Sequence, residues 1–283
     1  MILRGGARGA GSFGALCVLT ATLMTSAANA GSLYTIYDAN SEAVFDPFSQ
    51  AGHRDWLVDG IDHLQTEWFW VRIGGAGGEI PLNALTLIGV GTFDTNSSAD
   101  NRHDTVSMLF REPGQSPRYE VELSFKLRGG YVGGLKSDLS EIVRVNNLTR
   151  EPLDLHLFQY VDFDLDGTPG GDTVFFENAN SVRQNGELTS LNETVVTPGS
   201  SHREANVYPA TLNSLNDGNP TTLSDNSGPL MGDVTWAFQW DRSVIPGGSF
   251  IISKNKSVMV PEPTSIALLA IGMLIKRRAQ RVS

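Results

Sequence analysis

The chain has 283 residues, of which 40% are hydrophobic, 8% aromatic and 18% charged, so it is long enough for one large all-β domain or two ordinary domains. With 30 glycines and 13 prolines it is neither a collagen nor a coiled coil, and its apolar content excludes wholesale disorder. Between residues 31 and 260 there are 15 basic and 30 acidic side chains, a net charge of about −15 that argues against nucleic acid as a partner.

Residues 1–30 have the three parts of a secretory signal peptide. Arg4 and Arg8 precede an apolar stretch at 13–24, and Ala28-Asn29-Ala30 provides a cleavage site. We expect removal of this segment after Ala30. The single cysteine, Cys17, lies inside it, so the mature chain is expected to have neither a disulfide nor thiol chemistry.

The body, residues 31–259, consists of short β-branched and aromatic runs separated by turn residues. These runs predict an all-β fold, a single large antiparallel β-sandwich. Residues 55–64 are ambiguous, because their helical spacing is interrupted by Gly60. Residues 197–233 are predicted to be a long excursion from the sandwich. The predicted strands are 67–73, 85–93, 105–110, 119–127, 141–146, 153–165, 173–177, 233–240 and 249–253.

Several aromatic side chains recur at alternate positions of the predicted strands. Alternation along 153–165 places leucines on one face and a mixture of aromatic rings, an imidazole and carboxylates on the other. That mixture is suited to stacking a sugar ring and hydrogen-bonding its hydroxyls. Aromatic residues in this pattern more often fill a sandwich core, and both interpretations stay open. The candidate carbohydrate-binding residues are Trp68, Trp70, His156, Phe158, Tyr160, Trp236 and Trp240.

A run of aspartates follows the longest predicted strand. Alternate carboxylates before a glycine are typical of the opening of a calcium loop, and the candidate ligands are Asp162, Asp164, Asp166 and Asp172. The twelfth residue counted from Asp162 is Thr173 instead of a bidentate glutamate, so the run is not an EF-hand. The alternative is a solvated hairpin rim.

Catalytic motifs are missing from the sequence. The five histidines have no zinc-type spacing, and there is no Gly-x-Ser-x-Gly elbow, His-Glu-x-x-His motif or phosphate loop. We therefore predict no catalytic residue and favour a protein without enzymatic activity. The alternative is a carbohydrate-active enzyme that resembles the galactose-mutarotase-like supersandwich in general build, with His156, Asp162, Asp164 and Glu67 as participants.

The C-terminal residues 260–283 also have three parts. Pro261-Glu262-Pro263 precedes an apolar run at 266–275, which is followed by the basic tail 276–281. As a helix the run is about 16 Å long, half of a bilayer core, and its basic tail favours a cytoplasmic C-terminus. This end resembles the PEP-CTERM sorting signal of Gram-negative bacteria.

The resemblance implies export through the Sec translocon, a transient inner-membrane anchor with the body outside, and processing near the motif by an exosortase. Members of this group are associated with exopolysaccharide and biofilm. The chain is thus expected to comprise a signal peptide (1–30), a β-sandwich body (31–259) and a sorting signal (260–283). We expect a cell-surface or extracellular-matrix protein that binds or scaffolds exopolysaccharide, with calcium as a candidate cofactor.

Overall fold

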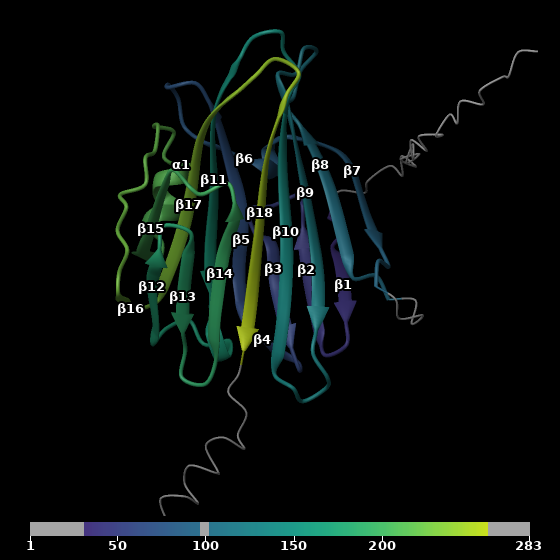
Figure 1. Ribbon diagram of the computed structural model, residues 1–283, viewed down its shortest axis with the longest axis vertical. Coiled ribbons are helices and arrows are strands. Elements are labelled where there is room, and N and C mark those ends of the chain that lie inside the picture. Colours follow the sequence, from purple (N-terminus) through teal and green to yellow (C-terminus); the bar gives the residue numbers. More distant parts are fainter. Residues whose placement is uncertain (1–30, 97–101, 260–283) are drawn as a thin grey trace, which may run out of the picture.

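Two large β-sheets face each other in the computed structural model, which describes residues 31–96 and 102–259 (Figure 1). The predicted signal peptide and sorting signal lie outside the described residues. Apart from a short parallel contact between β3 and β5, the strand pairs are antiparallel. The prediction of an all-β, antiparallel sandwich is confirmed.

We call the two layers sheet A and sheet B. The strand order in sheet A is β1 (Tyr34–Asp38), β2 (Ser41–Asp46), β3 (Gly52–Val58), β5 (Leu64–Ile73), β11 (Leu153–Phe163), β17 (Val234–Val244) and β15 (His202–Val207). The short strands β4 (Ile61–Asp62) and β6 (Ile80–Pro81) pair with β3 and β5. The order in sheet B is β16 (Leu230–Gly232), β12 (Asp172–Asn178), β13 (Ser181–Asn185), β14 (Ser190–Thr197), β18 (Ser249–Met259), β10 (Lys136–Asn147), β9 (Tyr119–Gly129), β8 (Thr105–Arg111) and β7 (Thr86–Phe93).

Strand alternation builds the core between the sheets. In β9, Val121, Leu123 and Phe125 are buried, whereas the side chains between them are partly exposed. The ambiguous segment 55–64 is a hairpin and not a helix. Asp59 and Gly60 have φ values of 49° and 82°, and this turn reverses the chain between β3 and β4.

The prediction that residues 197–233 leave the sandwich is wrong in part, because His202–Val207 is β15 of sheet A and Leu230–Gly232 is β16 of sheet B. The central strands of sheet A are buried on both faces, because their outer face is covered by the remaining excursion, residues 208–229 between β15 and β16. Its helix α1 (Ala210–Asn216) contacts β15 and β17, and Leu215 and Leu223 are buried there (Figure 1). The chain also contains the 3₁₀ turns η1 (Leu82–Ala84) and η2 (Leu165–Gly167). Within the described ranges, no helix is long and apolar enough to cross a membrane, and the predicted membrane segment 266–275 is outside them.

Candidate functional site

Six of the seven candidate carbohydrate-binding residues are internal. Trp68, Trp70, Phe158, Tyr160, Trp236 and Trp240 are each 0% exposed. Trp70 packs edge to face on Tyr160, with 6.2 Å between ring centroids, and its Nε1 donates to Asn216 Oδ1 of α1 at 3.2 Å. The predicted sugar-binding surface on these rings is therefore wrong. Sandwich packing and the excursion over sheet A take up the faces that a sugar would need.

His156, the seventh residue, belongs to a chain of side chains on the outer face of sheet A. It is 17% exposed, and its Nδ1 lies 2.6 Å from Asp241 Oδ1. The other Asp241 oxygen lies 3.8 Å from His202 Nε2, and His202 Nδ1 lies 2.8 Å from Asp225 Oδ2. Imidazoles and carboxylates thus alternate along this face.

The participants named for the enzyme alternative do not meet at one site. Glu67 faces the sandwich interior, where it contacts Lys256 of sheet B. His156 faces the opposite side of sheet A. Asp162 lies six residues further along β11, a separation of about 20 Å. Three separate places hold the four residues, which therefore cannot act together on one substrate.

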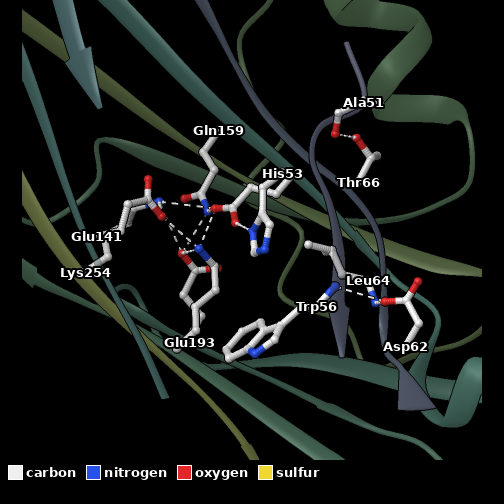
Figure 2. A network of polar contacts seen from close by, with 12 residues as sticks. Ala51, His53, Trp56, Asp62, Leu64, Thr66, Glu141, Gln159, Glu193 and Lys254 are labelled. Carbon is white, nitrogen blue, oxygen red and sulfur yellow. Dashed lines mark hydrogen bonds and ion pairs between the residues drawn. The ribbon is translucent and has the colours of Figure 1, made fainter. Parts of the chain in front are cut away.

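Charged and polar side chains from both sheets meet in the sandwich interior, and Figure 2 shows several of them pointing toward one another. Strands β3, β5 and β11 of sheet A supply His53, Glu67 and Gln159, and strands β10, β14 and β18 of sheet B supply the remaining four. All seven are at most 1% exposed. We call this set the buried charge network; its members are His53, Glu67, Glu141, Gln159, Glu193, Lys254 and Lys256.

Glu67 is the main acceptor from sheet A. Its Oε2 lies 3.1 Å from His53 Nδ1, and its Oε1 accepts from Gln159 Nε2 at 2.7 Å. The ammonium of Lys256 also donates to Oε1, and that of Lys254 lies 3.8 Å away. Glu67 therefore joins the two sheets through charge-assisted hydrogen bonds.

The other two carboxylates reach the same lysines from sheet B. Glu141 Oε2 lies 2.9 Å from Lys254 Nζ and 2.8 Å from Lys256 Nζ. Glu193 Oε1 lies 3.4 and 3.6 Å from these two ammonium groups, and its Oε2 accepts from Trp236 Nε1 of sheet A at 2.9 Å. Three acidic groups thus surround two basic ones.

Burial and the neighbouring charges shift the pKa values of the network's carboxyl groups in opposite directions. Burial would raise the pKa of Glu67, but Lys256 and the hydrogen bond to His53 outweigh it and hold that pKa well below its ordinary value. Burial raises the pKa of Glu141 to about 7, against the attraction of both lysines. Burial also lowers the pKa of His53. A proton on Glu141 would balance the charges, and because no member is open to solvent we assign the network a structural role.

The aspartate run separates into different contacts. Asp166 accepts from the Thr189 hydroxyl and from the backbone N–H of Leu188 at 2.8 Å. Asp172 Oδ2 accepts from Gln184 Nε2 at 2.5 Å. Only Asp162 and Asp164 remain together, so the set of four predicted calcium ligands is corrected: two members instead hold the 164–172 loop against neighbouring strands.

An open hollow of about 400 Å³ lies on the outer face of sheet B. We call it the polar hollow. Strands β9, β10, β14 and β18 form it, and Leu139 and Lys256 complete its lining, so it lies directly over the buried charge network. Its other lining residues are Arg128, Asp138, Ser140, Asn192, Thr194, Asn255 and Ser257.

Strand register aligns these polar residues in two rows across the sheet. One row runs through Arg128, Asp138, Ser257 and Asn192, which are successive register partners. The adjacent row runs through Ser140, Asn255 and Thr194. Amides and hydroxyls both donate and accept hydrogen bonds, and an array of them can bind a ligand that carries many hydroxyl groups.

This hollow was not among the sites predicted from the sequence. Its signal was present as alternate polar residues, Asp138 with Ser140, Asn192 with Thr194, and Asn255 with Ser257. Polar residues at alternate strand positions indicate only a solvent face. The hollow emerges when register brings β9, β10, β14 and β18 side by side.

No family model and no curated protein matches the chain. Among solved structures, the fold is similar to that of a bacterial glucoamylase complexed with acarbose (TM-score 0.57, 12% identity), across 88% of this chain and 35% of that chain. It is also similar to a galactose mutarotase related enzyme from Lactobacillus acidophilus (TM-score 0.51, 9% identity), across 81% of this chain and 97% of that one. A galactose mutarotase-like protein from Clostridium acetobutylicum gives a TM-score of 0.50 at 9% identity, across 81% and 95% of the two chains.

These likenesses place the body among β-sandwiches made of two large, mainly antiparallel sheets. At 9–12% identity they concern the fold alone. The chain also spans only about a third of the length of the glucoamylase chain that it matches.

The network predicts unequal effects for one type of substitution. Glu67→Gln should lower the free energy of unfolding by about 3–5 kcal/mol, because it leaves buried ammonium groups short of their partner. Glu141→Gln should cost less than about 1 kcal/mol at pH 7, because this carboxyl is already partly protonated there. Urea unfolding followed by tryptophan fluorescence measures both. Equal losses of unfolding free energy in the two variants would contradict the assignment of a charged Glu67 and a partly protonated Glu141.

The same pair of proteins predicts a pH effect. A raised pKa means that folded Glu141 holds its proton where the unfolded chain has lost it, so this group's contribution to stability falls as pH rises from about 4.5 to 7. Relative to the native protein, Glu141→Gln should therefore become more stable between pH 5 and pH 8. Urea unfolding midpoints of both proteins across this pH range test the prediction. A variant that became less stable than the native protein as pH rises would contradict it.

Proposed function

We propose that the chain is an exported cell-surface or extracellular-matrix protein whose sandwich binds polysaccharide through the polar hollow without catalysis. The observation that carries the proposal is the pair of hydrogen-bonding rows across four strands of sheet B. The volume of the hollow, about 400 Å³, is in the range of small-molecule sites. Its open form suits a segment of a polymer that enters and leaves on either side.

The negative charge of the body indicates which class of polysaccharide it would bind. The body carries about −15, and the hollow itself is lined by one basic and one acidic outward side chain, Arg128 and Asp138. A polyanion would be repelled by the body as a whole, whereas neutral sugar hydroxyls would meet Asn192, Asn255 and the nearby hydroxyls. We therefore expect a neutral polymer to bind more tightly than an anionic one.

The two termini support the export part of the proposal. Residues 1–30 would direct the chain to the Sec translocon. Pro261-Glu262-Pro263 and the segment after it would hold the chain briefly in the inner membrane until an exosortase acts. The body would then reach the envelope or the matrix, where exopolysaccharide is available.

A carbohydrate-active enzyme is the second candidate. It is favoured by the pairing of His156 with Asp241 on the outer face of sheet A and by the similar fold of a galactose mutarotase related enzyme. An imidazole held by a carboxylate is a common general acid or base. This candidate requires the sugar to be altered, whereas binding in the polar hollow leaves it intact.

The sorting proposal predicts a processing defect. Replacing Pro261, Glu262 and Pro263 with alanine should leave the chain uncleaved at its C-terminus and retained in the membrane fraction of the producing cells. Mass spectrometry of fractionated cells measures both, with Pro113→Ala as the control outside the motif. Normal processing of the triple-alanine chain would contradict an exosortase-dependent route.

The binding proposal predicts that two amides on neighbouring strands act together. The double variant Asn192→Ala/Asn255→Ala should weaken binding to the producing organism's exopolysaccharide about tenfold or more, since each lost hydrogen bond contributes about 0.5–1.5 kcal/mol. Asn146→Ala, on the same face of sheet B but outside the hollow, should bind normally.

Co-sedimentation with the polymer gives the affinity, and the polymer's chain length is followed in the same tubes. Unchanged affinity in the double variant would move the site elsewhere. Shortened polymer would favour the enzyme.

A further inference from the structure

Three carboxylates converge at one end of sheet A. Asp162 is the penultimate residue of β11, Asp164 follows that strand, and Asp233 directly precedes β17, its neighbour in the sheet. One oxygen from each lies within 4.8 Å of the other two. Asp233 was outside the predicted aspartate run, because the fold and not the local sequence places it there.

Asp162 gives this cluster a feature that an exposed acidic patch lacks. The residue is only 2% exposed, and its Oδ1 has no hydrogen-bond partner within the described residues. Burial, together with the charges of Asp164 and Asp233, raises its pKa to about 7. A buried carboxylate oxygen without a partner costs stability, so this geometry is expected to be completed by a ligand that accepts its lone pairs.

A second compact group of acids in the same chain provides a contrast. Glu67, Glu141 and Glu193 also lie within 4.8 Å of one another, but Lys254 and Lys256 lie between them. Their negative charge is therefore already compensated by the protein. Among the described residues, Asp162, Asp164 and Asp233 form no such ion pair.

We propose that Asp162, Asp164 and Asp233 bind a calcium ion. All three offer oxygen atoms, the donors that hard cations prefer, and the group contains no imidazole or thiolate to favour zinc. Calcium accepts six to eight oxygens in flexible geometry, so waters reaching the site past the exposed Asp233 would complete its coordination.

The ion would have a mechanical consequence. It would tie the end of β11 to the start of β17 and to the loop that begins at Asp164, beside the excursion over sheet A. Tying these three segments stabilises the folded chain by mass action, because the unfolded chain does not hold the carboxylates together. This proposal does not rest on polysaccharide binding.

Calcium-dependent thermal unfolding of the full chain tests the proposal. After dialysis against EDTA, 2 mM calcium chloride should raise the melting temperature by about 3–5 °C, and magnesium chloride at the same concentration should raise it less. Terbium bound at the site should emit on excitation of tyrosine, because Tyr160 Oη lies 3.4 Å from Asp162 Oδ2. Added calcium should displace the terbium and so reduce this emission.

Two variants and one control locate the ion. Asp162→Asn removes the buried charge with the same shape, and Asp233→Ala removes an exposed ligand whose loss should not prevent folding. Both should abolish the calcium-dependent rise, whereas Asp154→Ala, at the exposed opposite end of β11, should retain it. Absence of any calcium-dependent rise in the native chain, or an equal rise in both site variants, would overturn the proposal.

Discussion

The structure depends on burying two lysines and three glutamates between its sheets. Lys254 and Lys256 are at alternate positions of β18, so both point inward, and the residues beside them, Asn255 and Ser257, point outward into the polar hollow. The same alternation operates in β14, where Glu193 points inward between outward Asn192 and Thr194. A slip of one residue would expose the ion pairs and bury unpaired amides, so the network fixes the register that builds the polar hollow.

Sheet A differs from sheet B in that both of its faces are covered. Its inner face meets the network, and its outer face carries Trp70 and Tyr160 beneath α1. Covering this face removes the aromatic rings from solvent and leaves sheet B with the open polar face. The acidic cluster at the end of β11 differs from the network in that its charges lack basic partners within the described residues. The proposed calcium ion would supply the positive charge there that Lys254 and Lys256 supply in the network.

Sequence patterns predicted the sandwich because strands such as 67–73 and 153–165 combine aromatic and β-branched residues with clear turn signals. They did not predict which face of β18 is inside, since Lys254, Asn255, Lys256 and Ser257 are all polar and the hydrophobic rule is silent there. The aspartate run was recognised, but Asp233 is 69 residues from Asp164 in the chain, and only the pairing of β11 with β17 brings them together. The polar hollow likewise required the register of four strands.

Hydroxyl-radical footprinting of the protein with and without the producing organism's exopolysaccharide would show which face of the sandwich binds the polymer. Binding in the polar hollow predicts protection of the segments around Ser140, Asn192 and Asn255 on sheet B, with the polymer's chain length unchanged. Protection around His156 and His202 on sheet A, accompanied by conversion or shortening of the sugar chain, would contradict it and place an enzyme's site on the opposite layer.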